Sequence, residues 1–209
     1  MGKRALFGGL YAAVLIGVFG LTSFGPYLLA VFALLLMNEV SRLLKMESKV
    51  PIMVFTFLVL LAGAIFDWGD HNDIVTSTVM LSTMLVLTLL RAKQPALEMR
   101  KSFFGLIYIY VPMIYVIQTA VISPKLILFI FILIWSSDTF AYLVGKGFGK
   151  HPFAPKLSPK KTIEGFVGGI IGTLIIGAVT NFFWGLTTMP IALSLAVTVS
   201  LICLLYTSP

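Results

Sequence analysis

The sequence predicts an all-α, polytopic transmembrane protein with about eight spans. Of its 209 residues, 59% are hydrophobic and only 11% are charged, whereas a soluble domain carries about 25% charged residues. Apolar runs close to the roughly 20 residues that a helix needs to cross a bilayer recur along the whole chain. Because one soluble core of this size could not bury so much apolar surface, we expect much of it to face lipid.

The apolar runs give eight candidate spans in chain order. The first follows "MGKR" and is interpreted as a retained span, because no cleavage site typical of a signal peptide comes after it. The candidate spans cover residues 5–21, 26–44, 51–66, 73–91, 103–122, 124–144, 163–184 and 188–206. Since no repeat or low-complexity linker separates them, we expect residues 1–209 to form a single integral membrane domain.

The basic residues predict the orientation of these spans. If the N-terminus is cytoplasmic, every Lys and Arg except Lys125 falls in a cytoplasmic segment, while Asp67, Asp70 and Asp73 fall outside. This positive-inside bias predicts a multi-pass protein of the cytoplasmic membrane. It also accounts for the net charge of +7, so we expect no nucleic-acid partner. The single cysteine, Cys203, excludes a disulfide framework or a Cys-rich zinc site.

Polar residues gather at the cytoplasmic end of the sixth span, where a carboxylate lies within the apolar run. Asp138 precedes Tyr142 by four residues, so the two share one face of a helix. A carboxylate in a span is unfavourable unless it has a partner or a ligand. Pairing with a loop lysine is the structural alternative. The segment "GKGFGKH" follows and carries Lys146 and Lys150. Its glycines would let backbone N–H groups approach a ligand, although a flexible basic loop explains them as well.

The segment "SPKKTIEGFVGG" predicts the start of the seventh span. Ser158 is a candidate N-cap with Pro159 at the first helical position, and Glu164 lies in the early turns. Lys160, Lys161 and Thr162 accompany it. A helix N-terminus of this kind favours phosphate, while capping and membrane anchoring are the structural alternative. Four glycines on one side of the helix predict close helix packing; they are Gly165, Gly168, Gly169 and Gly172.

The stretch from Ser137 to Gly169 resembles the bacterial phosphatidate cytidylyltransferase (CDP-diacylglycerol synthase) family. The matching order is D-[ST]-x-A-Y, then G-K-x-F-G-K-H, then A-P-x-x-S-P-x-K-T-x-E-G. The resemblance implies an enzyme of phospholipid biosynthesis, a nucleotidyltransferase that joins CTP to phosphatidate and releases pyrophosphate. It also implies a requirement for Mg²⁺. The substrates and the lipid bilayer would be its partners, and a homodimer is left open.

The resemblance also implies roles for the polar residues. Asp138 would orient a substrate or a metal-bound water, and Glu164 would hold a lysine or the metal shell. Together with Lys161 they form the expected catalytic set. Phosphate contacts are expected from Ser158, Lys161 and Thr162, supported by Lys150, and the remaining substrate-binding residues are Lys146 and Lys160.

The signature that the family carries further on, from G-D-[LFT]-x-E-S to H-G-G-x-x-D-R-x-D, is not in this sequence, which stops at "SLICLLYTSP". We therefore expect a truncated chain that lacks the main metal carboxylates and is inactive alone, and the metal ligands stay unknown. Two alternatives are a CTP-dependent polyprenol kinase and a transporter with Asp138 as a coupling residue. Transporters place such sites near the bilayer midplane, often in paired repeats, whereas the polar groups here gather at one face.

Overall fold

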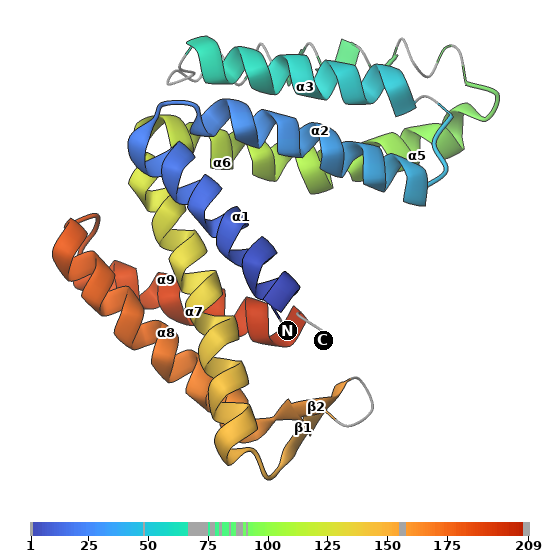
Figure 1. The fold of residues 1–209 in the computed structure, drawn as a ribbon. Helices are drawn as coiled ribbons and strands as arrows, with labels where there is room; N and C mark the ends of the chain where they lie inside the picture. The colour runs from blue at the N-terminus through green and yellow to red at the C-terminus, as the bar shows by residue number, and fades with distance from the viewer. Residues whose placement is uncertain are drawn as a thin grey trace. The chain divides into compact units, whose positions relative to one another are not determined.

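The computed structural model describes most of the chain as helices (Figure 1). The described residues are 2–47, 49–66, 75, 78–79, 81–83, 85–86, 90, 92–154 and 158–206, with backbone alone at 2–7, 49–51, 66, 154, 159 and 160. The predicted fourth span, 73–91, lies largely outside them, and the acidic segment with Asp67, Asp70 and Asp73 lies entirely outside. The chain divides into two compact units, Met1–Pro124 and Lys125–Pro209.

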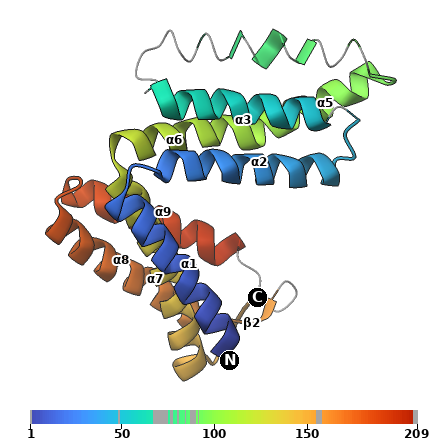
Figure 2. The ribbon, with the colours of Figure 1, turned by 45° about the horizontal axis from the view of Figure 1, so that its top comes forward.

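The first unit contains α1 (Gly2–Leu21), α2 (Gly25–Leu43), α3 (Lys49–Phe66), α5 (Pro95–Gly105), the π-helical turn η1 (Leu106–Tyr110) and α6 (Val111–Ile122). Helices α2, α3 and α6 pack against one another (Figure 2). Their buried contact includes Met37, Met46, Ile52 and Ile109. The fifth predicted span is part of a longer helical run, which starts at Pro95 rather than at residue 103.

The early start of that run includes Glu98, a charged residue that lay outside the predicted span 103–122. Its side chain is only 2% exposed. The carboxylate accepts a hydrogen bond from the backbone N–H of Glu47 at 3.0 Å and from Nζ of Lys101 at 2.9 Å. Nζ of Lys101 also donates to the carbonyl oxygen of Lys45. A buried carboxylate with these partners is satisfied, so it ties α5 to the segment after α2.

The second unit contains α7 (Pro124–Phe148), a two-stranded antiparallel hairpin of β1 (Pro152–Ala154) and β2 (Ser158–Thr162), and helices α8 (Ile163–Trp184) and α9 (Met189–Tyr206). The predicted spans 163–184 and 188–206 agree with α8 and α9. The turn between these helices is closed by Gly185, which has a left-handed φ of 60°, and by Asn181. The amide of Asn181 exchanges hydrogen bonds with the backbone of Thr187.

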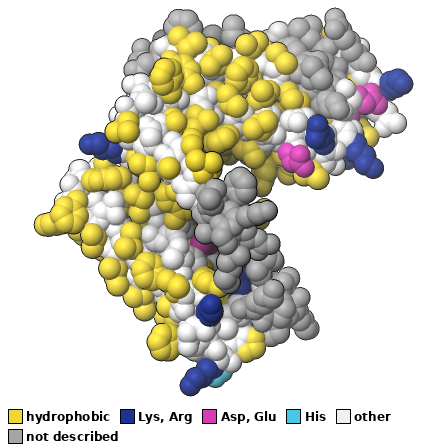
Figure 3. Space-filling model, viewed as in Figure 1, with side chains coloured by type: hydrophobic (Ala, Val, Ile, Leu, Met, Phe, Trp, Pro, Cys, Tyr) yellow, Lys and Arg dark blue, Asp and Glu magenta, His cyan; other side chains and the backbone are white. Residues whose placement is uncertain are grey.

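The helices confirm the all-α transmembrane class. Within the described residues, five runs are long and apolar enough to cross a membrane: Gly25–Leu43, Pro95–Ile122, Pro124–Phe148, Ile163–Trp184 and Met189–Tyr206. Two shorter apolar helices cover Gly8–Leu21 and Ile52–Ile65. Hydrophobic side chains cover much of the visible face of these helices (Figure 3). The chain is therefore a membrane protein, while the number of spans and the single domain stay predictions.

Glycines allow α7 and α8 to pack closely, as the sequence predicted. A Cβ atom added at Gly168 would lie 2.6 Å from side-chain atoms of Val144 on α7. One added at Gly165 would lie 2.8 Å from the carbonyl oxygen of Ala141. Gly169 faces both α7 and α9, where an added Cβ would lie 3.0 Å from Leu204. Side chains larger than glycine would push these helices apart, so the stripe determines their separation.

Candidate functional site

A hairpin, rather than a turn leading directly into a helix, occupies the segment from Pro152 to Thr162. Its strands pair with Pro152 opposite Thr162 and Ala154 opposite Ser158. The prediction that Ser158 caps the seventh span is therefore wrong. Helix α8 begins at Ile163, and Oγ1 of Thr162 accepts a hydrogen bond from the backbone N–H of Gly165 at 3.2 Å. Thr162 is the cap because its extended backbone ends the strand directly before the first helical turn.

Two glycines of "GKGFGKH", Gly145 and Gly149, allow close packing against Thr162. Helix α7 continues through Gly145 and Gly147 to Phe148, beyond the predicted end at residue 144. The backbone N–H of Gly149 donates to the carbonyl oxygen of Gly145 at 3.0 Å. A Cβ added at Gly145 would lie 3.1 Å from Oγ1 of Thr162. The end of α7 thus fits against the start of α8 because its surface there lacks side chains.

Glu164 holds the segment between α7 and β1. Its Oε2 accepts hydrogen bonds from the backbone N–H groups of Lys150 and His151 at 3.1 and 3.3 Å. Its Oε1 lies 2.6 Å from Nδ1 of His151. The backbone N–H of Ile163 also donates to the carbonyl oxygen of His151 at 2.9 Å. Glu164 therefore contacts a lysine, Lys150, through the backbone N–H group and not through the ammonium group. These hydrogen bonds restrict the backbone position of Lys150.

Stacking of two rings adds a second link between the hairpin and α8. The rings of Phe153 and Phe166 lie 4.7 Å apart, centroid to centroid, with an interplanar angle of 11°. This contact joins β1 to the second turn of α8. Together with the Glu164 bonds, it holds the hairpin at the end of the α7–α8 pair (Figure 1).

Lys161 lies in β2 beside the end of α9. Its Nζ donates a hydrogen bond to the carbonyl oxygen of Leu204 at 3.0 Å. This bond joins the hairpin to the last turns of α9. Asp138 lies on α7 and is exposed. An ammonium group has three N–H donors, so Lys161 retains donors for an anion.

Ser158 is the most unusual polar residue of the hairpin. It is only 4% exposed, and its Oγ atom has no hydrogen-bond partner among the described residues. Ser137, directly before Asp138, is fully buried and likewise has no partner for Oγ in the part of the chain that the structure describes. A buried hydroxyl without a partner is unfavourable. Within the described residues, both hydroxyl groups therefore keep unused donor capacity.

The other predicted cations lie at the same end of the unit. Lys150 is exposed, and Lys146 is exposed on the last turns of α7 with its Nζ 5.7 Å from the ring centre of Tyr142. The backbone of Lys160 lies in β2, but its side chain is outside the description. Figure 3 shows Lys or Arg and His side chains together at the hairpin end of this unit. The predicted phosphate-binding residues thus occur at one end of α7 and α8.

The described residues do not fit a complete metal centre. No group of three His, Cys, Asp or Glu side chains gathers within the part of the chain that the structure describes. Glu164 is already engaged by His151 and by two backbone N–H groups. The sequence did not identify the metal ligands, and the described residues do not identify them either.

Comparison with known proteins settles the family. The model of the cytidylyltransferase family matches residues 3–205. This chain belongs to the cytidylyltransferase family. The resemblance noted from Ser137 to Gly169 is therefore confirmed at the level of the family.

Three curated relatives of this cytidylyltransferase family chain carry the name phosphatidate cytidylyltransferase. That of Aquifex aeolicus is 45% identical over 80 residues, which are 38% of this chain and 31% of the relative. Those of Staphylococcus haemolyticus and Staphylococcus saprophyticus are 30% and 33% identical over 160 and 164 residues, covering 75% of this chain and 61% of each relative. The matched region thus spans less than two thirds of the relatives' length.

Two residues of the cytidylyltransferase family chain gained importance only from the structure. His151 is the direct partner of Glu164, 13 residues away. Glu98 was not singled out, although it is the most buried acidic side chain among those described. An acidic residue within a basic segment between two apolar runs is a weak signal for such a role.

Proposed function

We propose that this chain is the phosphate-binding part of a phosphatidate cytidylyltransferase. The enzyme transfers the cytidylyl group of CTP to phosphatidate, which gives CDP-diacylglycerol and pyrophosphate. The observation that carries the proposal is the hairpin end of the α7–α8 pair. Here Lys161, with donors to spare, shares one hairpin with Ser158, whose buried hydroxyl has no partner among the described residues, in a chain of the cytidylyltransferase family.

The location of this site suits two polyanionic substrates. Phosphatidate lies in the bilayer with its phosphate at the interface, and CTP approaches from water. We infer that the hairpin faces the cytoplasm and that the N-terminus is cytoplasmic, in the cytoplasmic membrane, as the basic residues predict. Lys146 and Lys150 attract the phosphates, and Ser158, Lys160, Lys161 and Thr162 contact them. Thr162 can do so while capping α8, because its hydroxyl accepts from Gly165 and remains free to donate.

The reaction requires mainly positioning and charge stabilisation. A phosphate oxygen of phosphatidate attacks the α-phosphorus of CTP in line, and the bond to the β-phosphate oxygen breaks to release pyrophosphate. Lys161 stabilises negative charge on the phosphoryl oxygens, which is the dominant effect in reactions of this type. Asp138 orients Lys161 and the substrate that it binds. Glu164 acts as a positioning residue, because its carboxylate holds Lys150 and His151.

Mg²⁺ belongs to the proposal as an ion that would neutralise negative charge on the substrate phosphates. The described side chains do not provide a set of three metal ligands. The further carboxylates that the family carries in its later signature are the expected ligands.

The position of the label in CTP tests the proposal. The assay uses a whole protein that contains these residues, purified in lipid nanodiscs with phosphatidate and Mg²⁺. Label in the α-phosphate or in cytidine should appear in the lipid, while label in the γ-phosphate should appear in pyrophosphate. Transfer of the γ-phosphate to a lipid would instead identify a kinase and contradict the proposal.

Cysteine labelling tests the proposed orientation. The single native cysteine is replaced (Cys203→Ser), and Lys150→Cys or Lys125→Cys is introduced. Lys125 and Lys150 are both exposed and lie near opposite ends of α7. In intact cells, a membrane-impermeant maleimide should label the cysteine at position 125 and leave the one at position 150 unlabelled. The reverse pattern would contradict a cytoplasmic hairpin.

A further inference from the structure

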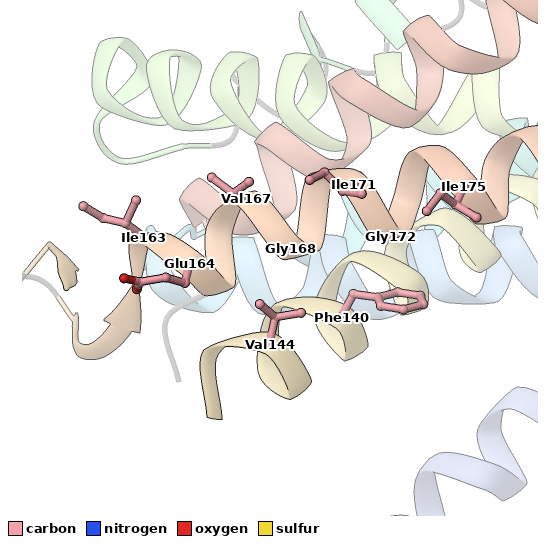
Figure 4. A pocket seen from close by; sticks show the side chains of 9 residues that line it. All are labelled: Phe140, Val144, Ile163, Glu164, Val167, Gly168, Ile171, Gly172 and Ile175. Atoms are coloured by element: carbon pink, nitrogen blue, oxygen red, sulfur yellow. The ribbon is translucent and has the colours of Figure 1, made fainter. Parts of the chain in front are cut away.

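An apolar groove of about 540 Å³ is lined by residues of α7 and α8. Figure 4 shows Phe140 and Val144 of α7 opposite Gly172 and Gly168 of α8. The α8 side is formed by a row of aliphatic residues spaced four apart: Ile163, Val167, Ile171 and Ile175. All four are about half exposed in this chain. The groove thus has apolar walls, and glycines line it where α8 lies closest to α7.

The length of the groove corresponds to one leaflet of a bilayer. From Ile163 to Ile175, α8 rises about 18 Å at 1.5 Å per residue. Half of a hydrocarbon core about 30 Å thick measures roughly 15 Å. The groove starts at the hairpin end of α8, which the proposed orientation places at the membrane surface, and ends near the middle of this 22-residue helix. It therefore has the depth that a single acyl chain occupies in that leaflet.

Only the hairpin end of the groove is polar. Glu164 is the one ionisable residue in its lining, and its carboxylate is engaged by His151 and by the backbone of Lys150. Lys150 and Lys146 are exposed at the same end of the helix pair. This arrangement favours an occupant with an apolar chain and an anionic headgroup.

We infer that the groove binds one acyl chain of phosphatidate while its phosphate lies at the hairpin. This inference rests on the proposed function, since it names the position of that substrate's chain. Val167 and Ile171 contact the chain, and Phe140 and Ile175 border the deep end. The groove thereby brings the phosphate of a membrane lipid to the lysines of the hairpin.

Photo-cross-linking of lipid to the 209-residue chain in nanodiscs tests the inference. The probe is phosphatidate with a diazirine midway along one acyl chain, and mass spectrometry maps the labelled residues. We expect label between Val167 and Ile175, and competition by unlabelled phosphatidate but not by phosphatidylcholine. Ile171→Trp should reduce this label about tenfold, which corresponds to lost burial of roughly two methylene groups.

Val179→Trp is the matched control variant. Val179 continues the same row on α8 and is 47% exposed, but it lies beyond the groove lining. It should leave the label unchanged. Equal labelling of the groove and of Ile202 on α9, or equal competition by phosphatidylcholine, would overturn the inference. So would a disulfide-linked dimer formed by Val167→Cys in a Cys203→Ser background, because a second copy would then fill the groove.

Binding and turnover separate this inference from the proposed function. Groove labelling without cytidylyl transfer by the whole protein would contradict the proposed function alone. Cytidylyl transfer without groove labelling would contradict the acyl-chain site alone.

Discussion

Oε1 of Glu164 lies 2.6 Å from Nδ1 of His151, across 13 residues of sequence. The other oxygen of the carboxylate accepts from the backbone N–H groups of Lys150 and His151. A single side chain in the first turn of α8 therefore holds the segment that follows α7. These bonds give the backbone of Lys150 a defined place beside the hairpin.

Glu164→Ala should loosen that segment without unfolding the helices. We expect amide hydrogen exchange at Lys150 and His151 to accelerate about tenfold, the effect of losing a net hydrogen bond of about 1.4 kcal/mol. Exchange within α9 should not change. Glu39→Ala, in the other compact unit, is the control substitution and should leave both amides unaffected. Unchanged exchange at Lys150 and His151 in Glu164→Ala would show that the carboxylate does not hold the segment.

Gly168→Ala should destabilise the α7–α8 pair. The added Cβ would lie 2.6 Å from Val144, so the helices must separate. Overpacking of this kind costs about 1–3 kcal/mol. Gly147→Ala is the control, because nothing lies within 4 Å of a Cβ at that helical position. It should be neutral or stabilising by up to about 1 kcal/mol. Reversible unfolding in mixed detergent micelles measures both, and equal stability of the two variants would contradict the close packing.

Ser158→Ala should change stability and binding in different directions. Removing a buried hydroxyl that has no partner among the described residues should leave stability unchanged or raise it slightly. If the hydroxyl binds phosphate, the affinity of the whole protein for its phosphate substrates should fall about tenfold. Ser200→Ala is the matched control, since Ser200 is fully buried but donates to the carbonyl oxygen of Val197.

The control should show the opposite pattern. Ser200→Ala loses a satisfied hydrogen bond and should be destabilised by about 1 kcal/mol, with substrate affinity unchanged. Thermal unfolding and equilibrium binding of labelled CTP measure the two effects. A loss of stability in Ser158→Ala comparable to that in Ser200→Ala would mean that Ser158 is a structural residue.

Hydropathy predicted the helices of the second unit well. The predicted span 163–184 has the bounds of α8, because a membrane helix needs one continuous apolar run. The end of α7 was placed too early, at residue 144. Gly145 and Gly147 suggest a loop in the sequence, but Gly145 remains helical where it packs against Thr162. The start at Pro95 was missed because Glu98 is charged. The sequence does not show that Glu98 is buried, since its partner Glu47 is distant along the chain.

The candidate site was predicted in its composition but not in its geometry. The sequence indicated which cations gather near the start of α8, and Lys161 and Lys150 do lie at that end of the unit. It could not show the hairpin, because Pro159 and the lysines that follow it are weak strand formers. Nor could it show that Ser158 is buried and that Thr162 is the cap. The burial of Ser158 and the cap at Thr162 depend on the pairing of β1 with β2. That pairing is supported by the contacts of Glu164 with His151 and of Phe166 with Phe153.

The central claim is that the hairpin end of α7 and α8 binds the substrate phosphates. The most direct test compares Lys161→Ala with Lys125→Ala, in a whole protein that contains these residues. Lys161 lies in the hairpin, whereas Lys125 lies at the far end of α7. Thermal unfolding of both variants controls for the lost bond between Lys161 and Leu204. The account predicts that kcat/KM for CDP-diacylglycerol formation falls by about 10²–10³ in Lys161→Ala and stays unchanged in Lys125→Ala. Wild-type kcat/KM in a folded Lys161→Ala variant would contradict it.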